Sequence, residues 1–161
     1  MSARDRQTTR AAAPNRRECP LKLSAAFGEQ LRIDSGKSMK LRIKGNSLRL
    51  RLTRDEVGRA GAGQTIVEST PLTGATGFGY ALTPSDCATM AAALGERGLE
   101  VSVPRAALST WANSENVAVV CPAAAPGPDI LVEKDFACLS PRDGDDDANT
   151  FPHPEAGSKT C

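Results

Sequence analysis

Residues 40–52 read KLRIKGNSLRLRL, and this stretch decides the fold. Apolar side chains alternate with lysine and arginine on both sides of Gly45-Asn46, which is typical of two strands that each bury one face. A Gly-Asn pair between two such runs favours a two-residue hairpin turn. The predicted cross-strand pairs are Lys40–Arg51, Leu41–Leu50, Arg42–Arg49 and Ile43–Leu48. Every pair matches in character, so we predict an antiparallel hairpin with one apolar and one basic face.

A short helix is predicted directly after the hairpin. Thr53 and Glu56 have the spacing of a capping box, in which each side chain accepts a hydrogen bond from the other residue's backbone. We expect the helix to end near Ala60, because two glycines follow it closely. Strands are then expected over residues 65–69 and 78–82, where apolar residues alternate again.

The same pattern returns when the sequence is shifted by 51 positions. Leu48, Leu50 and Leu52 then fall on Leu99, Val101 and Val103, Val57 falls on Leu108, and Ile66 falls on Val117. Thr53 falls on Pro104, another residue suited to a helix start. We therefore predict two ββαββ units, at about residues 40–82 and 91–135, in one small α+β domain that is mainly β. A chance similarity between two β-rich stretches is the alternative.

The second unit requires a strand over residues 87–94, ending in a loop at residues 95–98. Its Ala-Thr-Met-Ala-Ala-Ala-Leu string also has good helix propensity. Residues 39–139 are the expected domain, followed by an acidic, proline-containing tail at residues 140–161.

Charge divides the chain into two parts. Residues 1–60 carry a net charge of about +9 and residues 61–161 about −8. Residues 1–38 show little periodicity and are predicted to be a disordered extension, with Met39 as the expected start of the protein. No apolar run is long enough to span a membrane or to serve as a secretory signal, which favours a cytoplasmic protein. The five cysteines are odd in number and widely spread, so most are expected to be reduced.

Residues 44–53, a following helix and the glycine-rich entry at residues 61–63 resemble the swapped-hairpin β-barrel of AbrB and MazE-type transcription regulators and antitoxins. The resemblance implies a barrel made of two ββαββ halves that binds DNA through basic hairpin residues. Two chains supply the halves in that family, whereas here both expected halves lie in one chain. The second half also lacks the basic hairpin, since Glu100 and Ser102 stand where the first half has arginines.

A longer resemblance extends from Met39 to the end of the chain. It includes residues 132–139, which read VEKDFACL, and residues 150–154, which read TFPHP. Both are similar to segments of a family of short bacterial proteins of unknown function. This resemblance implies no activity.

The basic face of the hairpin is the candidate functional site. Like charges lie opposite one another there, which costs stability unless something compensates for them. DNA phosphates would do so through sequence-independent contacts, and arginine also reads base edges. An acidic protein partner, or carboxylates of the same chain such as Glu133, Asp135 and the tail aspartates, would do so equally. The predicted nucleic-acid-binding residues are Lys40, Arg42, Lys44, Asn46, Arg49 and Arg51.

The tail holds residue types that bind metal ions. Zinc takes thiolate, imidazole and carboxylate ligands, and the candidates are Cys138, Asp145, His153 and Cys161. Their spacing matches no zinc finger. Asp143-x-Asp145-x-Asp147 alternates like a calcium loop, but the glycine and the bidentate glutamate of that loop are missing. A solvated acidic loop is the alternative to both metals.

No catalytic set is visible in the sequence. His153 is the single histidine, and no serine or cysteine has an arrangement that marks it as activated. We therefore predict a non-enzymatic, DNA-binding protein of the regulator or antitoxin kind, with no cofactor unless the tail binds zinc. The alternatives are a protein-interaction module that docks an acidic partner and a small metal-dependent enzyme.

Overall fold

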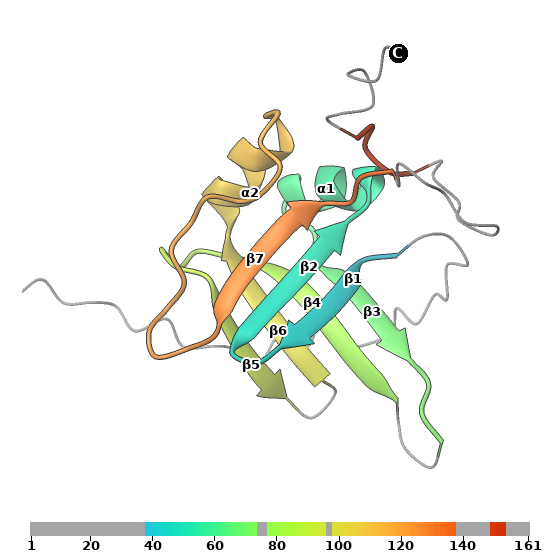
Figure 1. Ribbon diagram of the computed structural model, residues 1–161. Coiled ribbons are helices and arrows are strands. Elements are labelled where there is room, and N and C mark those ends of the chain that lie inside the picture. Colours follow the sequence, from blue (N-terminus) through green and yellow to red (C-terminus); the bar gives the residue numbers. More distant parts are fainter. Residues whose placement is uncertain (1–37, 74–76, 96–97, 138–148, 154–161) are drawn as a thin grey trace, which may run out of the picture.

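The computed structural model describes residues 38–73, 77–95, 98–137 and 149–153 (Figure 1). In this part of the chain the fold is mainly β with two short helices. The elements in chain order are β1 (Lys40–Lys44), β2 (Ser47–Leu52), α1 (Arg54–Gly61), β3 (Ile66–Thr70), β4 (Phe78–Ser85), β5 (Ala91–Gly95), β6 (Gly98–Pro104), α2 (Arg105–Ala112) and β7 (Asp129–Lys134).

The predicted hairpin is confirmed with its register. β1 and β2 pair antiparallel, and all four predicted cross-strand pairs are present. Gly45 has a φ of +54°, a conformation that glycine adopts without strain and that the turn requires. The capping box of α1 is also confirmed, with Thr53 and Glu56 bonded in both directions. These features depend on neighbours in sequence, so the sequence alone specifies them.

The strands form two mixed sheets. One has the order β1-β2-β7 and the other the order β3-β4-β6-β5. Each contains one parallel pair between strands that are not consecutive in sequence: β2 with the distant β7, and β4 with β6, which β5 separates. In Figure 1 the three-stranded sheet lies in front of the other, and both helices lie at one end. Both sheets contribute to one core, which includes Leu50 and Val132 from the first sheet and Leu82 and Val101 from the second.

The expected closed barrel is not observed, because neither sheet closes on itself. Closure would need hydrogen-bonded pairing between an edge strand of one sheet and an edge strand of the other. No such pairing occurs among the strands that the structure describes. The internal duplication of the ββαββ unit stays a prediction.

The strand expected over residues 87–94 begins later than predicted. Residues 86–89 form bends, and β5 starts only at Ala91. Met90 instead pairs with a distant loop, since its N–H donates to Pro122 O and its carbonyl accepts from Ala124 N. The helix propensity of this segment is overridden by its antiparallel pairing with β6.

The strand expected near Val117 is reduced to a single bridge between Ala118 and Glu133. Val119 N donates to Val132 O, and Lys134 N donates to Val117 O, so this segment still runs along the outer edge of β7. It protects that edge without forming a regular strand.

Part of the predicted tail packs onto the domain. Arg54 N donates to Asn149 O, which satisfies a backbone donor at the start of α1. Phe151 N donates to Asp135 O, and Phe151 O accepts from Ala137 N. Residues 149–153 therefore belong structurally with the end of β7 and the start of α1.

Candidate functional site

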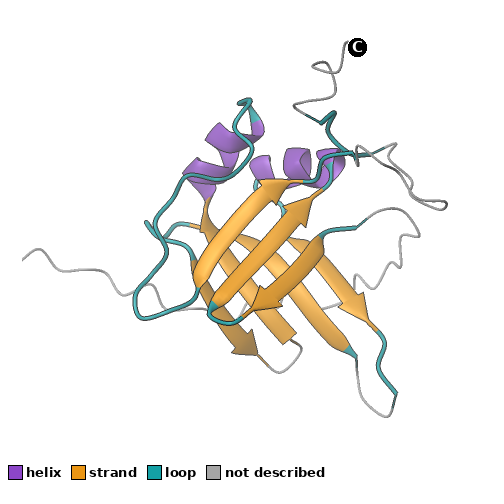
Figure 2. Cartoon of the chain, viewed as in Figure 1, coloured by secondary structure: helices purple, strands orange, loops and turns teal. Residues whose placement is uncertain are grey.

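The predicted basic residues lie on β1 and β2 of the three-stranded sheet, and Figure 2 shows all the strands of the fold in orange. Lys40, Arg42 and Lys44 alternate along β1, and Arg49 and Arg51 alternate along β2. The leucines of β2, which are Leu48, Leu50 and Leu52, are buried on the opposite face. The hairpin thus presents all five cations on one side.

Asn46 lies in the turn and is exposed. Its backbone carbonyl accepts a hydrogen bond from Asp129 N at 2.9 Å. The turn is therefore attached to the first residue of β7, which fixes its position at the end of the sheet remote from the helices (Figure 1).

Carboxylates of the same chain neutralise one end of the basic face. Lys40 Nζ lies 2.7 Å from Asp135 Oδ2, and Arg51 Nε lies 2.6 Å from Glu133 Oε1. The parallel register places Arg51 beside Glu133 on the same face of the sheet. The side chains of both acids are largely buried, with 11% of Glu133 and 3% of Asp135 exposed. We call these four residues the paired root of the hairpin.

The other end of the basic face has few ion pairs among the residues that the structure describes. Arg49 Nε lies 3.3 Å from Glu133 Oε1, a carboxylate oxygen that it shares with Arg51. Arg42 and Lys44 are exposed and form no ion pair with any residue that the structure describes. We call Arg42, Lys44 and Arg49 the hairpin tip. Among the described residues, the intramolecular alternative therefore accounts for the root of the predicted site, while the tail aspartates that it also named lie outside the described residues.

A pocket of about 360 Å³ lies at the hairpin tip. It is lined by Arg42, Lys44, Ser47, Leu48, Arg49, Asp129, Ile130 and Leu131. Three cations and one carboxylate give this lining a net positive charge. Ser47 Oγ donates to Lys44 O at 2.8 Å and holds the start of β2 against the end of β1. Such a site suits an oxyanion such as a phosphate group.

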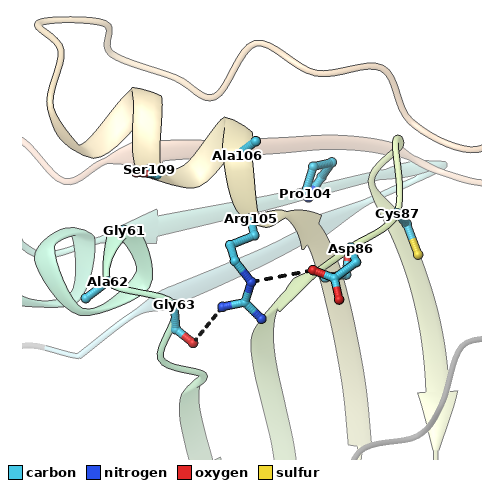
Figure 3. Close-up of a pocket in the computed structure, with 10 residues that line it drawn as sticks. Gly61, Ala62, Gly63, Asp86, Cys87, Pro104, Arg105, Ala106 and Ser109 are labelled. Atoms are coloured by element: carbon cyan, nitrogen blue, oxygen red, sulfur yellow. Dashed lines mark hydrogen bonds and ion pairs between the residues drawn. The ribbon is translucent and has the colours of Figure 1, made fainter.

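A larger pocket, of about 530 Å³, lies where the end of α1, the end of β4 and the start of α2 meet (Figure 3). Arg105 reaches across it: Nη1 donates to Gly63 O at 3.3 Å, and Nε lies 3.6 Å from Asp86 Oδ1. The Arg105 and Asp86 side chains are 51% and 94% exposed, so their ion pair is weak. Sequence reasoning missed this pocket, because its residues come from three segments with no shared motif.

Most of the candidate metal ligands lie in parts of the chain that the structure does not describe. Cys138, Asp145 and Cys161 lie outside the described residues, while His153 packs its ring edge against Phe136, with ring centroids 6.4 Å apart. Within the described ranges, no three histidine, cysteine or acidic residues lie close enough to hold a metal ion. The zinc and calcium alternatives stay predictions.

Two further expectations concern the cysteines and the membrane. Of the cysteines that the structure describes, Cys121 is free and Cys87 is disulfide-bonded. Burial raises the pKa of the Cys121 thiol, while a hydrogen bond with the backbone of Met90 lowers it. Neither α1 nor α2 has the length and apolar composition of a membrane-spanning helix.

Comparison with known proteins places the chain in a family but assigns no activity. The profile of DUF7009, a family of unknown function, matches residues 39–155. No curated protein and no solved structure matches the chain. The expected membership of an uncharacterised family is confirmed, whereas the likeness to AbrB-type barrels stays a resemblance.

Proposed function

Because the chain belongs to DUF7009, a family of unknown function, we propose a function from its own residues: the hairpin tip binds nucleic-acid phosphates. The observation that carries this proposal is the division of the basic face. Arg42 and Lys44 have no carboxylate partner in the part of the chain that the structure describes, and Arg49 has only a shared one. An exposed cluster of like charges is destabilising by itself, so an anionic partner would relieve it.

The exposed cations beside an exposed turn favour DNA as that partner. The tip would meet the phosphate backbone as one end of a three-stranded sheet, because β2 pairs with β1 on one side and with β7 on the other. The tip cations would contact phosphates, which fix position and register. Asn46 is exposed in the turn, and asparagine pairs with adenine through two hydrogen bonds.

The paired root has a different role in this proposal. Lys40 and Arg51 bind Asp135 and Glu133, so they hold β7 against the hairpin and contribute little to phosphate contacts. Each phosphate neutralised by a cation contributes about −0.9 to the slope of log affinity against log salt. Three tip cations therefore give a slope of roughly −2 to −3. Weak binding that is lost at moderate salt follows.

Tip variants of the full chain test the proposal in a mobility-shift titration with a DNA duplex at low salt. Arg42→Ser and Lys44→Ser should each weaken binding by several-fold. Arg59→Ser is the matched control, because Arg59 is an exposed cation on α1, on a different part of the surface. If Arg59→Ser weakens binding as much as the tip variants do, the hairpin tip is not the DNA-binding site. No binding by the wild-type chain would leave an acidic protein partner as the candidate for the tip.

We also propose that the two halves of the domain arose by duplication and that the protein is a cytoplasmic regulator or antitoxin-like protein. Matching pairings support the duplication. β2 pairs in parallel with β7, and β6, its counterpart under the 51-residue shift, pairs in parallel with β4. α1 and α2, which follow β2 and β6, both have eight residues. Only the first half carries the basic tip, so a single DNA contact per chain is expected.

A further inference from the structure

The side chain, the backbone N–H and the backbone carbonyl of Met39 each make a contact that fixes its position. Its side chain is fully buried in the core. Its backbone N–H donates to Glu56 Oε1 at 2.8 Å, and its carbonyl accepts from the Tyr80 hydroxyl at 2.6 Å. The nitrogen of this residue is therefore placed against a carboxylate by three separate contacts.

Glu56 is only 5% exposed. Its second oxygen, Oε2, accepts from the backbone N–H and the hydroxyl of Thr53, both at 2.9 Å. All of these donors are neutral, and no lysine or arginine forms an ion pair with Glu56 among the described residues. A buried carboxylate without a cation is costly.

A second carboxylate, that of Glu68 on β3, lies beside the first. Burial, the charge of Glu56 and a side-chain hydrogen bond with Glu56 raise the pKa of Glu68, while a hydrogen bond with Ser38 and the charge of Arg59 lower it. Burial and the same two carboxylates raise the pKa of Tyr80 on β4. The nitrogen of Met39 therefore lies against the carboxylate of Glu56, which is in turn hydrogen-bonded with Glu68.

We propose that Met39 is the first residue of the functional protein and that its α-ammonium group binds the carboxylates of Glu56 and Glu68. An α-ammonium group brings a positive charge and three N–H donors, whereas an internal amide brings no charge and one donor. The family profile begins at this same residue. Lys40 follows, and its large side chain protects the initiator methionine from removal by aminopeptidase.

The pairing predicts a pH dependence with a definite sign. An α-amino group has a pKa of about 8 in an unfolded chain, and two neighbouring carboxylates raise it in the folded one. The stability that this pair contributes is fully present below about pH 8 and is lost as the pH rises through the raised folded value.

The first test is the intact mass of the protein, tagged at its carboxy terminus and isolated from its source organism at its own expression level. The expected mass corresponds to a chain that begins at Met39 and retains that methionine. Any species that includes residues from 1–38, or that begins after Met39, overturns the inference.

The second test compares Glu68→Gln in two proteins, one beginning at Met1 and one at Met39. In the chain that begins at Met1, Glu68 lies beside Glu56 without an ammonium group, so the variant should unfold at an equal or higher temperature at pH 7. In the chain that begins at Met39, it should unfold at a temperature lower by roughly 5 °C, and this loss should vanish near pH 10. Glu115→Gln, on an exposed loop, is the control.

The two tests distinguish this inference from the alternative that Glu68 only packs beside Glu56 and binds no ammonium group. If Glu68 is simply protonated beside Glu56, glutamine replaces it well, and the variant has the same effect in both proteins. That result, or a failure of the protein beginning at Met39 to fold, contradicts the inference. Neither test measures DNA binding, so their results neither support nor contradict the proposed function.

Discussion

Arg51 and Glu133 face each other in the parallel register of β2 and β7, with Arg51 Nε 2.6 Å from Glu133 Oε1. The same carboxylate oxygen lies 3.3 Å from Arg49 Nε. One largely buried acid thus holds two of the five hairpin cations. The strand that completes the sheet therefore also sets how much positive charge the hairpin offers to a partner.

Glu133→Gln should have opposite effects on stability and on DNA binding. Glutamine keeps the shape of the side chain but leaves both arginines without an ionic partner. We expect the free energy of unfolding to fall by about 1 kcal/mol, a modest value because both arginines are partly exposed. DNA affinity should rise, and the salt slope should steepen by roughly 1, because Arg51 becomes available beside the three tip cations and Arg49 loses its shared carboxylate.

Urea unfolding and a salt series of binding titrations measure these two effects. Glu115→Gln removes one negative charge from an exposed loop and serves as the control for net charge. Lower stability with unchanged affinity would place Arg49 and Arg51 outside the interface.

Phe151→Ala should detach the segment at residues 149–153. The ring packs against Phe136, with centroids 6.0 Å apart, and lies under the cations of Lys134 and Arg54, at 5.1 and 5.5 Å. Because the ring is only partly buried, we expect a loss of roughly 2–3 kcal/mol, below the cost of a fully buried phenylalanine. Faster proteolytic cleavage within residues 149–153, measured by mass spectrometry, should accompany it. Phe151→Leu should retain most of the protection, and equal cleavage of both variants would contradict this role.

Gly98 and Gly58 should respond oppositely to alanine. Gly98 has a φ of +134°, and an added Cβ would collide with the backbone carbonyl of Gly79, its partner in the parallel pairing of β4 and β6. We expect Gly98→Ala to cost more than about 3 kcal/mol. Gly58 lies in α1 with open space around its Cβ position, so Gly58→Ala should stabilise the protein by about 0.5–1 kcal/mol. The unfolding temperatures of both variants measure these effects. If Gly98→Ala unfolds at the wild-type temperature, β4 and β6 pair differently.

The predictable parts of the fold are those specified by near neighbours. The hairpin register follows from the alternation around Gly45-Asn46, and the start of α1 follows from Thr53 and Glu56. Nothing local indicates that β7 lies parallel to β2, because the strands are separated by most of the domain. From the sequence alone, Glu133 and Asp135 are therefore only candidate partners, and the division of the basic face is apparent only in three dimensions.

The errors have the same physical origin. Residues 87–94 lack a turn signal before Ala91, and Met90 pairs with Pro122 and Ala124, which no pattern within the segment specifies. The larger pocket, around Arg105, likewise assembles from segments that share no motif. Long-range contacts, rather than propensity, determine both.

Binding of the full chain to a labelled DNA duplex across a salt series, measured by fluorescence anisotropy, tests the central claim most directly. The account predicts a slope of log affinity against log salt of roughly −2 to −3 for the wild type. In the double variant Arg42→Ser, Lys44→Ser, the slope should be shallower by roughly 1 to 2. No binding at high micromolar protein and low salt would contradict the account. So would a slope that the double variant leaves unchanged, because the contact would then lie outside the hairpin tip.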